Sequence, residues 1–485
     1  MSTPTSPYSN DVRPNIIWFM VDQMRGQAMS IAGDPNVLTP NLDRMARGGV
    51  WLSGALSGFP LCCPARGAMV TGRYPHLCVP GHQYPLDPEI PTIADAFNAA
   101  GYRTAWFGKW HLDGFHESSG RAAWHIIPPE RRGRFRTWIG YDNNNSQYDC
   151  WVHGHDDTTE VPLQRLPGHE TGALTDMLLQ HITRHRDEPF FACVSVLPPH
   201  DPYIAPAEAS AARHNPAVLQ LRPNVPPVAA IEQRARRDLA GYYAQIEDID
   251  RNVGRLLTHL SDLGIADRTY VIFVSDHGDQ LGCHGHFEKM TPYEEAIRVP
   301  WLIYGGERWH YRYNWSGRVP LIPNHVDLPA TSLGLATLPV PSDMQGYDYS
   351  QFLRTPWTTP GILDDAPQEA YLQCVVPTEH AASVDMPWRG LVTRDGWKYV
   401  AFENQPYLLF NLNDDPYELA NLAHHAHARE TRRDLNERLR AWIAKTGDTF
   451  TLPAFTDAGS PHVTQAAHQR WPQPSSTWAA GAAAR

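Results

Sequence analysis

Positive charge is scarce in this sequence, because 41 lysine and arginine residues face 52 aspartate and glutamate residues in a chain of 485 residues. The formal net charge is −11, and the basic residues form no runs. A net acidic chain without a basic segment is a poor binder of nucleic acid or of membrane surfaces. We therefore expect neither partner, and an anionic substrate would need positive charge concentrated in a pocket.

Long apolar runs and a disulfide framework are also missing. No stretch reaches the roughly 18 consecutive apolar residues of a membrane span, so we expect none. The seven cysteines are an odd number and are scattered along the chain, unlike the cysteines of a disulfide scaffold. The first 15 residues show no charged segment followed by an apolar one, as a signal peptide would. These features predict a reduced, cytoplasmic enzyme; a periplasmic or secreted location would require further sequence at the N-terminus.

Hydrophobic residues make up 42% of the chain, enough for a sizeable core. In the first two-thirds, strand-like and helix-like segments alternate, which predicts an α/β fold. Strands are expected at 15–21, 50–56, 103–107, 189–197, 269–274 and 299–304, and helices at 40–48, 93–100, 171–185 and 231–260. Thr39 followed by Pro40, and Thr92 with Asp95, are typical helix starts.

The pattern changes after about residue 345. Short strands at 390–393, 398–402 and 408–412, then an amphipathic helix at 431–445, predict a small α+β domain with an antiparallel sheet. We divide the chain into a catalytic α/β domain (1–365), this small domain (366–450) and a C-terminal tail (451–485). A proline- and alanine-rich surface excursion is expected at 205–230.

Polar side chains directly follow several predicted strands. These residues are Asp22, Lys109, His111, His200, Asp276 and His277. Open α/β sheets bind ligands in the crevice at the carboxyl ends of their strands, so we expect these residues to meet in one place.

The segment Cys62-Cys63-Pro64-Ala65-Arg66 stands where a helix can begin at Pro64. Cys62 would then lie at the helix N-terminus, where free N–H groups and the helix dipole favour an alkoxide or a sulfate. A buried structural cysteine pair is the alternative interpretation of these two residues.

Together with Thr71-Gly72-Arg73, this segment resembles the signature of the type I, formylglycine-dependent sulfatases of the alkaline phosphatase superfamily. The resemblance implies that a maturation enzyme oxidises Cys62 to Cα-formylglycine, while Cys63 fills the variable position. It also implies an alkaline phosphatase-like fold, with a large mixed, mostly parallel sheet sandwiched by helices. Gly396–Tyr399 and Leu412–Glu418 resemble elements of the family's small domain.

The resemblance extends to a divalent-cation site. Its implied ligands are Asp22, Gln23, Asp276 and His277, together with the oxygen of the formylglycine made from Cys62. The Asp–Gln and Asp–His pairs resemble the choline-sulfatase and phosphonate-monoester-hydrolase branches of the superfamily. Calcium is the family default, and the histidine ligand also admits manganese or magnesium.

The same resemblance assigns catalytic roles. Lys109 and His111 match the pair that contacts the formylglycine hydrate, and Arg66 belongs to the nucleophile motif. His200 and Lys289 match the residues that bind the sulfate and help the alcohol leave. In the implied reaction a hydrate hydroxyl attacks sulfur, the alcohol departs, and His111 takes a proton from the second hydroxyl.

Three functions therefore remain open. We expect a sulfatase acting on a small-molecule or oligosaccharide sulfate ester; the alternatives are a phosphonate monoester or phosphodiester hydrolase, and an unmodified binding protein. The loop at 141–151 is a candidate sugar-binding loop or an asparagine-rich turn. Rim candidates are Glu379, His380, Trp388 and Arg389. Surface or rim roles, rather than zinc binding, are expected for His153, His155, His284, His286, His424, His425 and His427.

Overall fold

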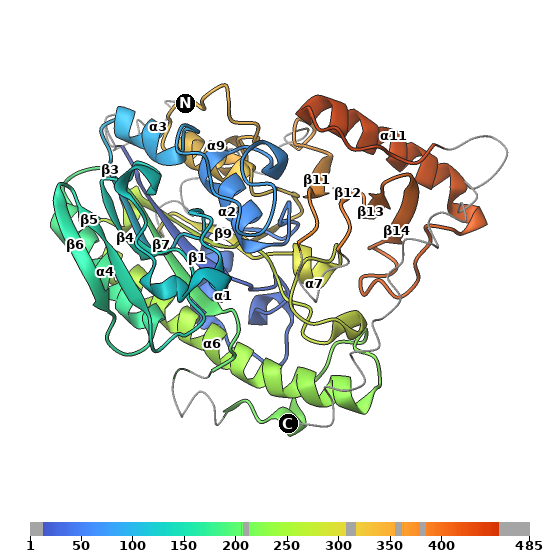
Figure 1. Cartoon of the computed structure of the whole chain (residues 1–485), viewed down its shortest axis with the longest axis horizontal. Helices are drawn as coiled ribbons and strands as arrows, with labels where there is room; N and C mark the ends of the chain where they lie inside the picture. Colours follow the sequence, from blue (N-terminus) through green and yellow to red (C-terminus); the bar gives the residue numbers. More distant parts are fainter. Residues whose placement is uncertain are drawn as a thin grey trace, which may run out of the picture.

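The structure is a computed structural model that describes residues 13–204, 206, 213–306, 317–354, 361, 363–378 and 385–454. Two separate sheets organise these residues (Figure 1). The larger sheet has the strand order β10-β2-β9-β8-β1-β7-β3-β4-β5-β6. Its strands are β1 (Asn15–Asp22), β2 (Val50–Leu52), β3 (Arg103–Lys109), β4 (Thr137–Tyr141), β5 (Trp151–Asp156), β6 (Thr159–Arg165), β7 (Phe190–Pro199), β8 (Thr269–Ser275), β9 (Trp301–Tyr304) and β10 (Gly317–Val319).

The centre of this sheet is parallel, and both its faces are buried. β1 pairs in parallel with β7 on one side and with β8 on the other, and β3 pairs in parallel with β7 and β4. Antiparallel pairs occur toward the edges, where β9 pairs with β2 and β8, and β5 pairs with β4 and β6. The continuous apolar run of β1 is explained by this position, because every one of its residues is buried.

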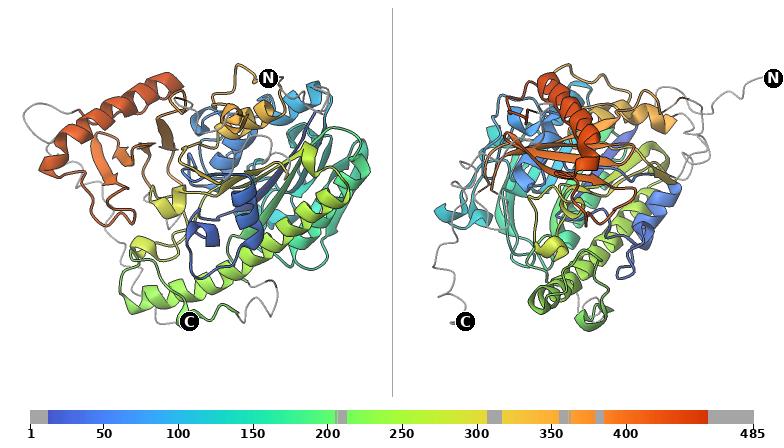
Figure 2. Two further views of the ribbon diagram at one scale, coloured as in Figure 1. Left: turned by 180° about the vertical axis from the view of Figure 1, so that it is seen from behind. Right: turned by 90° about the vertical axis from the view of Figure 1, so that its right-hand side faces the viewer.

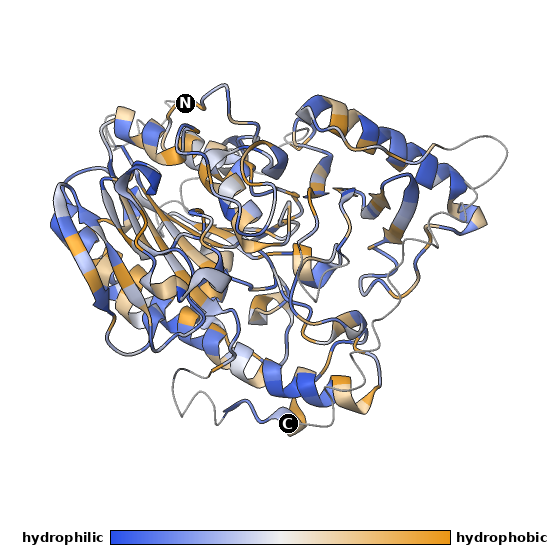
Figure 3. Cartoon of the chain, viewed as in Figure 1, coloured by the Kyte–Doolittle hydropathy of each residue, from blue (hydrophilic) through white to orange (hydrophobic). Residues whose placement is uncertain are grey.

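Helices cover the two faces of the sheet (Figure 2). Ile16, Trp18 and Met20 of β1 point into one core cluster, whereas Ile17 and Phe19 point into the other. The first cluster includes residues of α2 (Cys62–Thr71), α3 (Ile93–Ala99) and α9 (Asp327–Leu335). The second includes residues of α1 (Pro40–Gly48), α4 (Glu170–His185) and α6 (Ala229–Asp262). The hydropathy colouring shows many apolar residues in the strands, whereas polar and apolar residues alternate along α6 (Figure 3).

The smaller sheet is antiparallel, with the order β11-β12-β13-β14. Its strands are β11 (Glu369–Cys374), β12 (Trp388–Thr393), β13 (Trp397–Phe402) and β14 (Gln405–Asn411). The helix α11 (Arg429–Thr446) packs on one face of this sheet, and two short helices, α7 (Glu294–Ile297) and α10 (Ser350–Arg354), precede it in the chain. One apolar cluster joins Leu56, Phe59 and Ile297 to Leu372 and Val400, so the two parts of the molecule share a core.

The expected fold class is confirmed, and most of the expected elements are present. The capping box of Thr92 and Asp95 begins α3. Thr39 is the N-cap residue of α1 and Pro40 its first residue, as expected. The Thr39 side chain makes no capping hydrogen bond, and the Asp250 carboxylate of α6 instead accepts from the N–H groups of Asn41 and Leu42 at 3.0 and 2.8 Å. The expected strand at 50–56 is wrong in extent, since β2 ends at Leu52.

Four strands of the larger sheet were missed, namely β4, β5, β6 and β10, and β11 was missed in the smaller sheet. The domain boundaries at 365 and 450 stay predictions, and most of the tail and of 205–212 lies outside the described residues. Within the ranges that the structure describes, no helix is both long and apolar enough to cross a membrane.

Candidate functional site

The expected meeting of polar residues at the strand ends is found. Asp22 is the last residue of β1, Lys109 is the last residue of β3, and Asp276 directly follows β8. Because these parallel strands end at the same edge of the sheet, the three side chains lie close together. Each of them is completely or almost completely buried.

Cys62 is the first residue of α2 and lies above this edge. Its side chain is buried, and its Sγ is 3.1 Å from His277 Nε2 and 3.6 Å from Asp22 Oδ1. The ammonium of Lys289 donates to the same sulfur from 3.5 Å. Leu61, the residue before α2, is extended and provides no side-chain cap. The sulfur therefore sits at an uncapped helix N-terminus, among an imidazole, a carboxylate and an ammonium group.

Two buried cations balance the two buried carboxylates. Lys109 Nζ lies 2.6 Å from Asp22 Oδ2, and Arg66 Nη2 lies 3.4 Å from the same oxygen. Arg66 Nε donates to Asp276 Oδ2 at 2.8 Å. Burial alone would raise the pKa of Asp22, but the charge of Lys109, together with that of Arg66, holds that pKa well below its usual value. Asp22 is therefore ionised at neutral pH.

The donor atoms of four residues are arranged as the ligands of one cation would be. Asp22, Cys62, Asp276 and His277 each offer an atom within 4.8 Å of the others. His277 Nε2 is 3.4 Å from Asp22 Oδ1 and 3.8 Å from Asp276 Oδ1. Two ligands held at right angles by a cation with bonds of about 2.4 Å would be about 3.4 Å apart. The residues therefore fit a hard divalent cation with oxygen and nitrogen ligands.

Gln23 lies beside this group, but its amide faces other partners. Its Oε1 accepts from Lys289 Nζ at 2.6 Å, and its Nε2 donates to Asp279 Oδ2 at 2.6 Å. Burial raises the pKa of Asp279 to about 6, although Tyr203 and Gln23 donate to it and lower that value. The role of Gln23 as a metal ligand stays a prediction, and in this structure it holds Lys289 in place.

His200 and Lys289 form a pair, with Lys289 Nζ 2.7 Å from His200 Nε2. His200 Nδ1 lies 2.7 Å from the carbonyl oxygen of Asp201, so Nδ1 carries a hydrogen and Nε2 can accept from the ammonium. Gln147 holds the backbone of this segment, because its Nε2 donates to the carbonyl oxygens of His200 and Pro202 at 3.1 and 2.9 Å.

Gln147 was missed as a functional residue, although it lies in the loop at 141–151 singled out in the sequence. Its side chain is completely buried, so it supports the His200 segment instead of facing solvent. The sequence gives no signal for this contact, because 53 positions separate the two residues. Ser195, which accepts from Arg66 Nη1 at 2.8 Å, was missed for the same reason.

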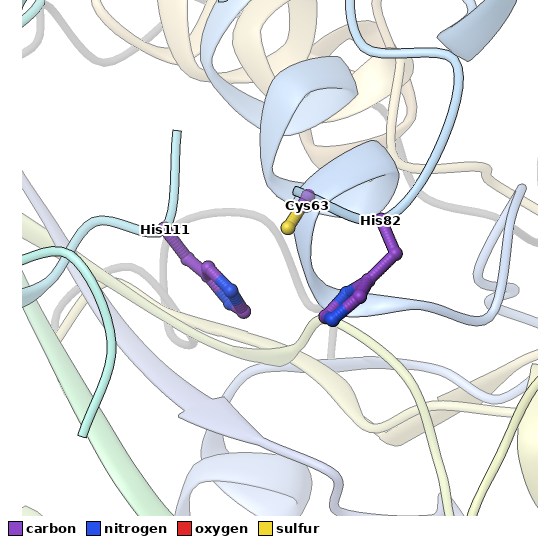
Figure 4. A group of neighbouring side chains, drawn as sticks. All are labelled: Cys63, His82 and His111. Atoms are coloured by element: carbon purple, nitrogen blue, oxygen red, sulfur yellow. The ribbon is translucent and has the colours of Figure 1, made fainter. Parts of the chain in front are cut away.

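His111 occupies the edge of this group. It has a left-handed backbone (φ 58°), and its ring lies beside Cys63 and His82 (Figure 4). Burial, then the charge of Lys109, lowers the pKa of His111 well below its usual value, so its imidazole is neutral. Among the described residues no hydrogen bond joins it to Cys62, and its catalytic role stays a prediction.

Two of the rim candidates are wrong. Trp388 is completely buried in the smaller sheet, and Arg389 is 3% exposed and paired with Asp448. Glu379 and His380 lie outside the described residues. His284 is grouped with Glu295 and Glu418. The surface or rim role expected for His153 is wrong, because its side chain is 1% exposed and its Nε2 accepts from the backbone N–H of Ile127.

Comparison with known proteins gives one consistent result. The family model "Sulfatase" matches residues 14–338, and the model "N-sulphoglucosamine sulphohydrolase, C-terminal" matches residues 282–445. An ulvan-active sulfatase from Formosa agariphila is 32% identical over 447 residues, covering 90% of this chain and 82% of the relative.

An N-acetylglucosamine-6-O-sulfatase from Bacteroides thetaiotaomicron is 25% identical over 505 residues, covering 88% of this chain and 86% of the relative. The crystal structure of a proposed sulfatase from Bacteroides fragilis superposes with a TM-score of 0.79 at 26% identity, covering 92% of this chain and 98% of the other.

Proposed function

The chain belongs to the sulfatase family and is a sulfuric ester hydrolase, and from this premise we propose that it hydrolyses a sulfate monoester of a carbohydrate. The nucleophile of the proposed reaction derives from Cys62, and a divalent cation assists it. The carbohydrate part of the proposal is supported by the sugar sulfatases among the relatives and by the C-terminal family match.

Two groups that the family implies would supply chemistry at this centre. A cation bound by Asp22, Asp276 and His277 would polarise oxygen ligands, and formylglycine at Cys62 would offer a hydrated aldehyde as the attacking group. Calcium is the cation we propose, and manganese or magnesium would suit the His277 ligand as well.

The chain's own residues hold this centre ready. Lys109 and Arg66 pair with the Asp22 and Asp276 carboxylates in a fully buried site. The uncapped N-terminus of α2 directs its dipole toward the side chain of Cys62, where negative charge is stabilised. Water is excluded by the burial of every one of these residues, which strengthens each electrostatic contact.

The pair of His200 and Lys289 acts on the departing group. Lys289 Nζ lies within reach of both the Cys62 sulfur (3.5 Å) and His200 Nε2 (2.7 Å), so positive charge faces the point of attack. Charge accumulates on the sulfate and alcohol oxygens in the transition state, and a proton delivered from this pair would neutralise the alkoxide.

The observation that carries the proposal is the position of Cys62. Its sulfur lies within 3.6 Å of His277, Lys289 and Asp22 at once. A structural cysteine pair does not account for that environment, because Cys63 faces a different group of residues.

The test is the release of inorganic sulfate from a panel of defined sulfated sugars by protein co-expressed with a formylglycine-generating enzyme. We expect turnover by the wild type and none by Cys62→Ala, while the variant keeps its fold and its metal content. Activity retained in Cys62→Ala would remove this residue from the mechanism.

Matched aryl sulfate and aryl phosphonate esters test the second candidate. Gln23 and His277 resemble the phosphonate-monoester-hydrolase branch, so this comparison is needed. We expect a higher kcat/KM on the sulfate, and a higher value on the phosphonate would reject the sulfatase proposal. Intact thiol at Cys62 after co-expression would favour the silent binding protein.

A further inference from the structure

Cys63, His82 and His111 form a second cluster of potential metal ligands (Figure 4). They come from three separate segments: Cys63 is the second residue of α2, His82 follows that helix in a loop, and His111 lies two residues beyond β3. Figure 4 shows both imidazole rings directed into the space below the Cys63 sulfur. None of these residues serves as a ligand in the cation site described above.

The three side chains are close enough to share one ion. Each offers a ligand atom within 4.8 Å of the others, and the two imidazole rings meet edge to face with their centroids 5.9 Å apart. Ligand atoms of a tetrahedral zinc ion are about 3.5 Å apart, because Zn–S and Zn–N bonds are about 2.3 and 2.0 Å long. Small side-chain rotations would bring ligand atoms that lie up to 4.8 Å apart to the spacing that zinc requires.

A further observation, besides the cluster itself, indicates a ligand here. His111 is 4% exposed, and its Nδ1 makes no hydrogen bond to any described residue. A buried ring nitrogen without a partner is costly unless something binds it. The sulfur of Cys63 is 1% exposed and lies within 4.8 Å of a ring nitrogen of each histidine.

We propose that Cys63, His82 and His111 bind Zn²⁺ or a chemically similar transition-metal ion, at a site separate from the carboxylate-rich cation site. One thiolate and two imidazoles are soft and borderline ligands, which zinc prefers, whereas calcium prefers oxygen. Binding releases the thiol proton of Cys63 to solvent, and a water molecule would complete the four-coordinate shell.

Occupation of this site would inhibit the enzyme, and this consequence alone rests on the proposed function. Zinc bound to a ring nitrogen of His111 would fix that imidazole and prevent it from exchanging protons with the adjacent centre. Zinc would therefore act as a reversible inhibitor that excess calcium does not displace.

Cobalt substitution tests the site independently of activity. Co²⁺ is added to the matured, full-length protein in the presence of excess Ca²⁺, and the thiolate-to-cobalt charge-transfer absorption is recorded. We expect this band in the wild type and in Cys62→Ala, and its displacement by one equivalent of Zn²⁺. Cys63→Ser should abolish the band, and His82→Asn should weaken binding by more than about 10–100-fold.

Cys78→Ser is the matched control, because Cys78 is a second buried cysteine that belongs to no ligand cluster. It should leave the absorption band unchanged. Absence of the band in the wild type, or its persistence in Cys63→Ser, would overturn the site. If the band forms but zinc leaves turnover unaffected, the inhibitory consequence fails while the metal site stands.

Discussion

The Cys62 side chain is buried and lies close to a positive charge. Its sulfur lies at the N-terminus of α2 and within 3.5 Å of Lys289 Nζ. An isolated ammonium in such a place would be expensive, and here Gln23 Oε1 at 2.6 Å and His200 Nε2 at 2.7 Å receive its hydrogens. These two acceptors hold the Lys289 ammonium in a fixed position before a substrate binds.

Replacement of Lys289 by methionine tests that charge. We expect kcat to fall about 10²–10³-fold, the typical cost of removing one preorganised donor to a transition-state oxyanion. Steady-state kinetics on a sulfated sugar measures the effect, and calcium content by mass spectrometry should stay unchanged. An unchanged kcat would contradict the role of Lys289, and a variant that loses calcium together with its activity would assign Lys289 to the metal site instead.

Gln147 offers a test of positioning by a residue that touches no reacting atom. Gln147→Leu removes both hydrogen bonds to the His200 segment, at 3.1 and 2.9 Å. We expect kcat to fall about tenfold or more, since small displacements of catalytic groups cost up to about 10²-fold, with a smaller change in KM. The exposed Gln164 on β6 provides the control variant Gln164→Leu, which should behave as wild type. Equal kcat in both variants would contradict the role.

The sequence predicts the site residues that belong to short motifs, but not the residues that contact them only in the folded protein. Cys62, Arg66 and Lys109 carry recognisable neighbours in the chain, and the structure brings them together. Gln147 and His82 gain their place only through tertiary contacts between distant segments, which no local pattern encodes. The same reason explains why a carboxylate 209 positions from Asn41, that of Asp250, accepts from the first N–H groups of α1 in place of the Thr39 side chain.

Among the elements, α11 and the smaller sheet share an apolar cluster, and a buried carboxylate adds polar contacts between them. Asp448, just beyond α11, pairs with Arg389 of β12 at 2.6 and 3.0 Å and accepts from Tyr371 and Gln373 of β11. Burial would raise the pKa of Asp448, but the Arg389 guanidinium holds it well below its usual value. The carboxylate is therefore ionised in the folded protein.

Asp448→Asn should lower the free energy of unfolding by about 2–4 kcal/mol at pH 7, because it leaves the Arg389 charge unpaired. The folded pKa of Asp448 is below the unfolded value of about 3.9, so its stabilisation is full above that pH and is lost below it. Urea unfolding at a series of pH values should show the two proteins converging as the pH falls below about 4. Asp434→Asn, at an exposed pair, is the control. A gap that widens with acid would refute the assignment.

The sequence predicts the central strands of the larger sheet, which are buried on both faces. β1, β7 and β8 are buried at every residue, are largely apolar and were predicted, whereas β5 and β6 alternate or mix polar residues and were missed. A strand of mixed polarity near the sheet edge resembles a loop in composition, and only its pairing partner defines it. β10, of three residues, is too short for any periodic signal.

Over the whole molecule, the two sheets behave as one packed body in the described residues. Lys398 of β13 donates to the Pro292 carbonyl at 2.8 Å and reaches Glu294 of α7 at 3.3 Å, and it also pairs with Glu418. Burial, relieved in part by Lys398, raises the pKa of Glu418 to about 8. The apolar cluster that joins both parts lies beside these charges.

Lys398→Met should destabilise the protein by about 3–5 kcal/mol, since it leaves buried carboxylates without their cation. Because the core is shared, circular dichroism and tryptophan fluorescence should still report one coincident unfolding transition. Lys445→Met, on the exposed face of α11, should change stability by less than about 0.5 kcal/mol. Two separated transitions in the wild type would show that the smaller sheet folds independently.

The dependence of activity on the state of Cys62 tests the central claim most directly. Preparations with different degrees of maturation are made by varying the co-expressed enzyme, and peptide mass spectrometry gives the fraction of Cys62 converted to the aldehyde. The account predicts that sulfate release rises in proportion to this fraction and extrapolates to zero in unconverted protein. Full activity in protein whose Cys62 is entirely thiol would contradict it.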